Sequence, residues 1–198
     1  MPIPSRARAL QITLILMLWV AVRFPTTTAA QEPLDLEFSG GGSFARNGGA
    51  NWLGWNVGVV TYLKSDLNVE VEVSRSSTSQ FQPYGFSYQL RQHTYTILAG
   101  PRLTGWKVRN MQTYIHLIFG AAISHYEYTY SSDPTTPLTP PFDDTTMALS
   151  VGGGIDRRLK GPLIWRVAAI DYFGFGFEGR WASGLRLSTG LVLRFSRK

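Results

Sequence analysis

The sequence predicts an all-β fold, an eight-stranded antiparallel up-and-down transmembrane β-barrel. The clearest observation is the last segment, residues 185–195, where an apolar set alternates with residues that include Arg186 and Arg194. Alternate side chains of a strand point to opposite faces, so one face of this strand is apolar and the other carries two arginines. Two further observations support this fold. The chain begins with the pattern of a secretory signal peptide, and no apolar run of 18 residues that could form a membrane-spanning helix follows residue 30. An apolar outside and a polar inside are typical of a bacterial outer-membrane barrel.

Residues 1–30 have the pattern of a secretory signal peptide. Arg6 and Arg8 form a basic start, an apolar run covers residues 10–22, and small residues precede Gln31. The apolar run has about 13 residues, whereas a membrane-spanning helix needs about 20. We therefore predict a signal peptide at 1–30 and an outer-membrane β-barrel domain at 31–198, with a retained amino-terminal anchor as the alternative.

The composition excludes several kinds of site. The chain has no cysteine, so neither a disulfide nor a thiolate metal site can form. Without the three arginines of residues 1–30, 16 basic residues face 13 acidic ones, an excess too small to indicate a nucleic-acid partner. The three histidines, His93, His116 and His125, lack the close spacing of metal ligands and are interpreted as single polar fillers. We expect no metal and no cofactor.

A two-residue period predicts eight strands, at about residues 34–44, 53–63, 67–76, 92–103, 113–126, 146–156, 163–173 and 184–195. The third is the clearest, because Leu67, Val69, Val71 and Val73 alternate with polar residues that include Glu70 and Glu72. In the sixth, Met147, Leu149, Val151 and Ile155 alternate with small and polar residues up to Asp156.

The predicted connections alternate in length. Long ones cover residues 46–52, 75–91, 127–145 and 174–183, short ones cover 64–66 and 157–162, and one of modest length covers 104–112. Outer-membrane barrels have short periplasmic turns and longer outer loops, so we expect both termini in the periplasm. Four prolines within residues 131–144 favour an extended loop there, with a linker between domains as the alternative. Residues 174–179 match a dinucleotide-binding fingerprint by letter, but no helical pattern follows, so we expect a glycine-rich outer loop.

Aromatic residues near the predicted strand ends indicate two interfacial girdles. Those toward the loops are Trp52, Trp55, Tyr126, Tyr128, Phe173 and Trp181, and those toward the turns are Tyr62, Trp106, Trp165 and Phe195.

The charged residues of the predicted strands share the face opposite the apolar one. We expect an ion-pair network in the lumen formed by Asp35, Glu37, Glu70, Glu72, Arg102, Asp156, Arg166, Arg186 and Arg194. The interior of an eight-stranded barrel is just wide enough to be filled by side chains, so these charges are expected to form a plug. Asp171 lies five residues after Arg166, so a regular strand cannot point both inward. Either a bulge intervenes or Asp171 lies at the outer rim.

Four segments, residues 95–102, 151–156, 166–172 and 185–195, resemble the OmpA-like or opacity-type outer-membrane β-barrel proteins. The resemblance covers nearly all of the chain after residue 30 and is specific for the barrel class, not for an activity. The last strand resembles the signal that the barrel-assembly machinery recognises, carried here by Leu185, Leu187, Leu191, Leu193 and Phe195, although three residues follow the final aromatic. The resemblance implies a monomer in contact with outer-membrane lipid and lipopolysaccharide, and it identifies no ligand for the loops.

A structural or adhesion-like surface role, without catalysis, is the function that the sequence favours. The second hypothesis is a narrow channel, since Gly120, Gly152, Gly154 and Gly190 could leave gaps in the lumen. The third is an enzyme, because some eight-stranded barrels are lipid A deacylases with serine, histidine and an acid on the lipid-facing wall. Ser124 and His125 are adjacent here, so they point to opposite faces, although Glu127 shares the side of the histidine.

Overall fold

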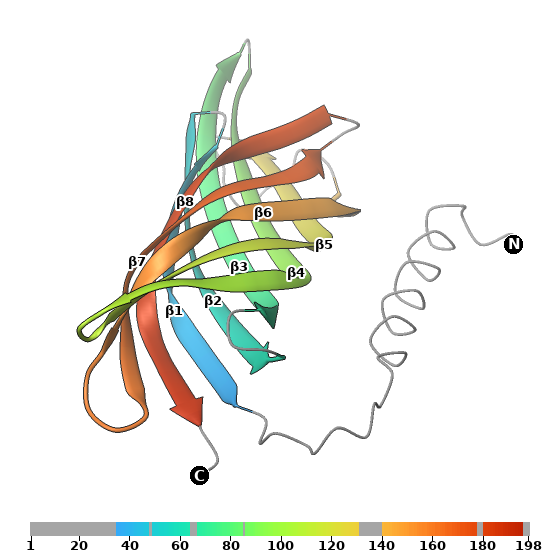
Figure 1. Cartoon of the computed structure of the whole chain (residues 1–198). Helices are drawn as coiled ribbons and strands as arrows, with labels where there is room; N and C mark the ends of the chain where they lie inside the picture. The colour runs from blue at the N-terminus through green and yellow to red at the C-terminus, as the bar shows by residue number, and fades with distance from the viewer. Residues whose placement is uncertain are drawn as a thin grey trace, which may run out of the picture. The chain divides into compact units, whose positions relative to one another are not determined.

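The computed structural model describes residues 35–47, 49–63, 67–84, 86–130, 140–177 and 180–195. The described strands are β1 (Leu36–Asn47), β2 (Ala50–Tyr62), β3 (Leu67–Tyr84), β4 (Phe86–Val108), β5 (Met111–Tyr130), β6 (Phe142–Arg158), β7 (Leu163–Phe177) and β8 (Arg180–Phe195). Each strand is antiparallel to its neighbours, and together they form a closed barrel in chain order (Figure 1). The predicted fold class is confirmed. The predicted signal peptide lies outside the described residues, and no helix within them is long and apolar enough to cross a membrane.

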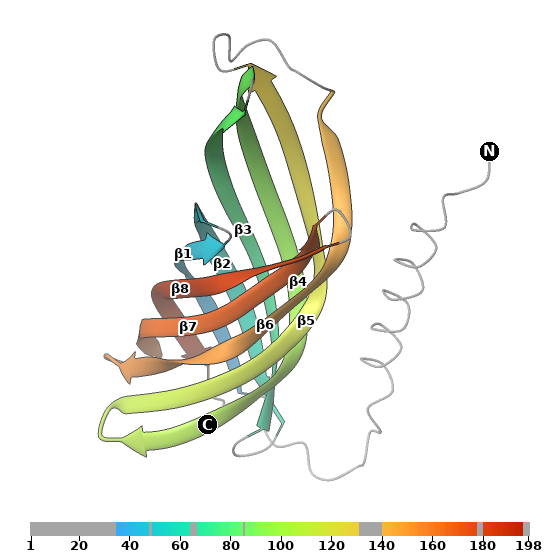
Figure 2. The same cartoon turned by 90° about the horizontal axis from the view of Figure 1, so that it is seen from above.

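The barrel closes where β1 pairs with β8, in a register that runs from Leu36 opposite Phe195 to Asn47 opposite Gly184. Figure 2 shows the strands curving around a common interior. At the middle of this seam Gly41 lies opposite Gly190. A Cβ added at Gly41 would overlap the Thr189 carbonyl oxygen, and one added at Gly190 would overlap the Gly40 carbonyl oxygen. Such a close approach of the two backbones therefore depends on two facing glycines.

The predicted assignment of faces is confirmed. Val71 is 43% exposed and Glu72 is 3% exposed, while Leu191 is 53% exposed and Val192 is fully buried. The outward residues of every strand are mostly apolar, whereas the buried interior holds many polar and charged side chains. This arrangement is the reverse of a water-soluble fold and is typical of a barrel that faces lipid.

Several strands extend beyond the predicted ends. Residues 75–91, predicted as a loop, mostly continue β3 and β4, which stay paired up to Tyr84 opposite Phe86. β4 and β5 likewise continue to Val108 and Met111. In the β3–β4 extension most residues are polar, so the apolar period ends although the backbone ladder continues. The expected contrast between long and short links is therefore wrong for the β3–β4 hairpin. It is also wrong for β1–β2 and β7–β8, because β1 ends at Asn47 and β2 begins at Ala50, while β7 runs through the predicted glycine-rich loop to Phe177 and β8 begins at Arg180. Of the proline-rich segment, residues 131–139 lie outside the described part.

The predicted aromatic girdles are only partly correct. Trp55, Trp106, Trp165, Trp181 and Phe195 are exposed on the outer wall. Trp52, Tyr126 and Phe173 instead point inward and are buried. A position near a strand end does not tell whether an aromatic residue belongs to an outer girdle or points into the lumen. Only its odd or even place in the alternation of the strand decides the face.

Candidate functional site in the barrel interior

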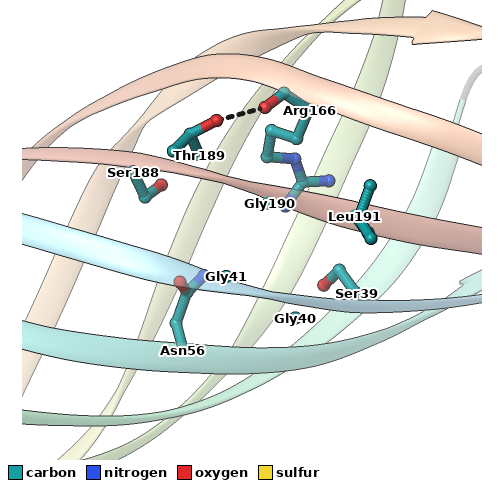
Figure 3. A pocket seen from close by; sticks show the side chains of 9 residues that line it. All are labelled: Ser39, Gly40, Gly41, Asn56, Arg166, Ser188, Thr189, Gly190 and Leu191. Carbon is teal, nitrogen blue, oxygen red and sulfur yellow. Dashed lines mark hydrogen bonds between the residues drawn. The ribbon is translucent and has the colours of Figure 1, made fainter.

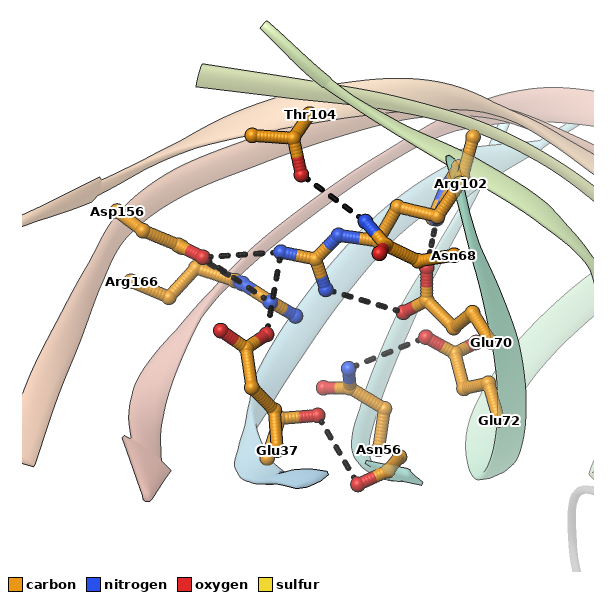
Figure 4. Close-up of polar contacts among 12 residues, drawn as sticks. Glu37, Asn56, Asn68, Glu70, Glu72, Arg102, Thr104, Asp156 and Arg166 are labelled. Carbon is orange, nitrogen blue, oxygen red and sulfur yellow. Dashed lines mark hydrogen bonds and ion pairs between the residues drawn. The ribbon is translucent and has the colours of Figure 1, made fainter. Parts of the chain in front are cut away.

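Inward positions of β1, β3, β4, β6 and β7 bring charged side chains together in the barrel interior (Figure 4), and β5 and β8 add His116, Arg186 and Arg194. Because successive residues alternate between the two faces, each strand contributes only every second side chain to this interior. The resulting network has three connected parts.

The first part is centred on Asp156. Arg102 Nη2 donates to Asp156 Oδ2 at 3.1 Å, and Arg166 Nε donates to Asp156 Oδ1 at 3.0 Å. The Arg102 guanidinium also forms ion pairs with Glu37 at 3.6 Å and with Glu70 at 3.9 Å. The ring of Tyr114 lies 3.8 Å from Cζ of Arg102 and 4.7 Å from Cζ of Arg166, as measured to the ring centroid, so it also contributes cation–π contacts.

The second part is centred on Arg186. Its Nη1 donates to Glu72 Oε1 at 2.7 Å, while its Nη2 and Nε donate to Asp171 Oδ2 at 2.8 and 3.1 Å. Both carboxylates are buried, so this arginine neutralises charges that water cannot reach.

His116 connects these two parts. Its Nδ1 lies 2.8 Å from Glu70 Oε2, and its Nε2 lies 3.0 Å from Asp171 Oδ1. A carboxylate only accepts hydrogen bonds, so both ring nitrogens donate, which requires the protonated imidazolium. With His116 charged, five cations balance the five buried acids Glu37, Glu70, Glu72, Asp156 and Asp171.

The third part lies at the barrel end where β1 begins and β8 ends. Arg194 lies directly opposite Glu37 in the β1–β8 register and forms an ion pair with it. The Tyr62 hydroxyl donates to Glu37 Oε1 at 2.5 Å. Asp35, expected to belong to this network, is half-buried and has no ion-pair partner within the described ranges. It precedes the first residue of β1, so no strand holds its side chain in the lumen.

A bulge in β7 decides the position of Asp171. The β7–β8 register pairs Arg166 with Gly190 and then Ala169 with Ser188, so β7 has one extra residue. The extra residue changes the parity of the strand, and Arg166 and Asp171 therefore both point inward. Thr189 Oγ1 donates to the Arg166 carbonyl oxygen at 2.9 Å beside the bulge (Figure 3).

The interpretation of His116 as a single polar filler was wrong. It faces inward on β5 together with Tyr114 and Ile118, and all three are buried. The sequence signal was the apolar alternation of Ile115, Leu117 and Phe119, which places His116 on the charged face. Its partners could not be found this way, because Glu70 and Asp171 lie on strands far from β5 in the sequence.

Beyond the charged network, the interior holds neutral polar side chains and an apolar cluster. Trp52, Leu98, Ile118, Ala122, Phe173 and Phe175 belong to one buried cluster, in which the rings of Trp52 and Phe175 meet edge to face at 6.1 Å. The gaps that the channel hypothesis expected beside glycines in the lumen are occupied by neighbouring atoms. A Cβ at Gly152 would overlap Asp171 Oδ1, and one at Gly154 would lie 2.8 Å from the Tyr114 hydroxyl. The cavity beside Gly190 is about 10 Å³, roughly the space of one water molecule (Figure 3).

A second set of polar side chains lies on the outer wall. Ser77, His93, His125 and Asp143 face outward in one row across β3 to β6. Ser77 Oγ lies 2.8 Å from His93 Nδ1, and His125 Nδ1 lies 2.7 Å from Asp143 Oδ1. Ser124 instead points inward, where its Oγ lies 2.8 Å from that of Thr94. Ser124 and His125 are therefore on opposite faces, and the described residues hold no group of acids and histidines that could bind a metal.

The fold has known counterparts. The structure of a major outer membrane protein from Thermus thermophilus matches with a TM-score of 0.59 and 13% identity, over 82% of this chain and 99% of that one. Neisserial surface protein A matches with a TM-score of 0.53 and 12% identity, over 82% of this chain and 97% of that one. This is the fold of the small outer-membrane barrels. No family model and no curated protein matches the sequence.

Proposed function

We propose that the chain is a non-enzymatic outer-membrane barrel with a structural or surface-interaction role. The observation that carries the proposal is the filled interior. Charged side chains occupy it from Arg194 to Arg186, and neutral polar side chains together with the apolar cluster around Trp52 and Phe175 fill further parts of it. A barrel packed in this way supports a stable wall better than it supports transport.

The charge balance of the interior gives the same support. Each buried acid of the network has at least one cationic partner, and Arg102 and Arg186 connect strands that are distant in the sequence. Breaking such a pair leaves an uncompensated charge, so the network favours a single rigid arrangement.

The outer wall supports a role in surface interaction. Near the strand ends opposite the termini, a shallow cavity of about 520 Å³ is lined by residues that include Phe44, Leu53, Ser77, Arg91 and His93. Polar and apolar groups meet there, as expected where lipid headgroups border a barrel. We propose both termini in the periplasm, lipid and lipopolysaccharide around the wall, insertion by the barrel-assembly machinery and a monomeric state.

Catalysis is not part of this proposal. Ser124 and His125 point to opposite faces, so they cannot act as nucleophile and base. His93 contacts Ser77, but no carboxylate is within hydrogen-bond distance of His93 among the described contacts.

Conductance in planar bilayers tests the proposal. The folded protein should give no regular current steps, whereas a variant hollowed by Trp52→Ala, Phe175→Ala and Arg186→Ala should give them and serves as the positive control. Heat-modifiable migration on gels checks that both proteins fold. Steps from the unaltered protein would favour the narrow channel. Altered acylation of lipid A on mass spectrometry after expression would favour the enzyme.

A further inference from the structure

A cavity of about 190 Å³ opens at the barrel end where β1 begins and β8 ends. Its lining includes Lys107, Arg109, Gln112, Asp156, Arg158 and Arg194, contributed by β4, the β4–β5 turn, β5, β6 and β8. We call it the basic vestibule. Its volume exceeds the share of about 30 Å³ that one water molecule takes in the liquid.

An irregularity in β4 places Lys107 in the vestibule. Arg102 points inward, and in a regular strand a residue five positions later would point outward. The β4–β5 register shifts between Thr104 and Lys107, so that Lys107 lies opposite Gln112, on the inward side of β5. Trp106, within the shifted segment, is 85% exposed on the outside.

The acidic groups near the vestibule are already neutralised. Asp156 accepts from both Arg102 and Arg166, and Glu37 pairs with Arg194. Lys107, Arg109 and Arg158 are exposed, and none has an ion-pair partner in the described part of the chain. Three uncompensated cations therefore surround a cavity whose floor is a network that is neutral by itself.

The geometry points to a binding site for a phosphate group. Arginine guanidinium groups donate in pairs to phosphate oxygens, and a multiply charged anion gains most from several converging cations. The asparagine and glutamine amides of the lining can donate further hydrogen bonds. The ion pairs at Asp156 close the inner side, so the vestibule holds its ligand and does not pass it through the lumen.

Two sources could supply the phosphate, a soluble phosphorylated compound or the headgroup of an anionic phospholipid. The site goes beyond the proposed function and does not depend on it, because a phosphate could bind here whether or not the barrel conducts.

Arg158→Gln and Arg157→Gln form a matched pair for the test. Arg158 lines the vestibule, whereas Arg157 is its neighbour on β6 and has the opposite parity, so both changes remove one charge from the same end. Pyrophosphate would be titrated calorimetrically into the refolded full chain in a zwitterionic detergent at low salt. Phosphatidylglycerol retained by each protein after extraction from membranes would be quantified by mass spectrometry.

We expect saturable pyrophosphate binding that Arg158→Gln weakens at least about tenfold and Arg157→Gln changes less than about twofold. Loss of retained phosphatidylglycerol in Arg158→Gln alone would support the site with a lipid headgroup as its ligand. The proposal is overturned if neither ligand binds, or if the two variants lose binding equally. Heat-modifiable migration of both variants shows that a loss is not due to misfolding.

Discussion

The guanidinium of Arg186 reaches across the barrel interior to Glu72, with 2.7 Å between Nη1 and Oε1, although the two residues are 114 positions apart in the sequence. The same side chain binds Asp171 on the neighbouring β7. One arginine thus connects β3, β7 and β8 at the centre of the fold.

Replacing Arg186 with leucine should destabilise the barrel by about 3–5 kcal/mol, because Glu72 and Asp171 would stay buried without a cation. Urea titrations of folding into lipid vesicles would measure the free energy of unfolding. Arg46→Leu is the control, since Arg46 is exposed and should change stability by only about 0.5 kcal/mol. Equal effects of the two changes would show that the central network does not hold the strands.

His116→Gln should cost about 2–3 kcal/mol, because a neutral amide cannot replace the charge between Glu70 and Asp171. His125→Gln makes the same chemical change on the exposed outer wall, where its pair with Asp143 contributes about 1 kcal/mol or less. The same vesicle titrations apply to both variants. A larger loss for His125→Gln would contradict the central place of His116.

Leu191→Arg should cost about 2–4 kcal/mol in a bilayer, because it places a charge on the lipid-facing wall. Val192→Ser should cost less, about 1–2 kcal/mol, since it removes buried methyl groups from an interior that already holds polar side chains. Folding into vesicles compares the two directly. Equal losses would mean that the faces of β8 are wrongly assigned.

Gly190→Ala should weaken barrel closure by about 1–3 kcal/mol, because the new methyl group would meet the backbone of β1. Gly42→Ala, on the same seam, has no atom within 4 Å of its added Cβ and should be neutral or slightly stabilising. The midpoint of thermal unfolding on gels would distinguish the two variants. An equal unfolding midpoint for the two variants would show that the close approach of β1 and β8 does not require a glycine at position 190.

Protease added to intact cells should cut between residues 131 and 144 and spare residues 157–161. β5 ends at Tyr130 and β6 begins at Phe142, at the barrel end opposite the β6–β7 turn and the start of β1. Antibody detection of the fragments gives the readout. Cleavage only after the outer membrane is opened would reverse the proposed orientation.

The existence of eight strands, and the faces of the residues in their central parts, could be predicted from the amino-acid sequence. The alternation of Leu191 with Val192, and of Val71 with Glu72, is a local property of consecutive residues, so it can be read without knowing which strands pair. The inward face of Glu37, Arg102 and Arg186 follows from the same period.

Only the folded barrel shows which charged side chains contact each other and where the two-residue alternation is interrupted. Arg186 contacts Glu72, and His116 contacts Glu70 and Asp171. These contacts form because barrel closure and strand register place strands that are distant in the sequence around one narrow interior. Bulges in β4 and β7 turn Lys107 and Asp171 inward. In β7 the parity conflict between Arg166 and Asp171 indicated an irregularity, but the sequence alone did not decide between a bulge and a place at the rim. Consecutive residues set the parity of each strand, but the partners of a buried charge depend on contacts between strands that lie many residues apart in the chain.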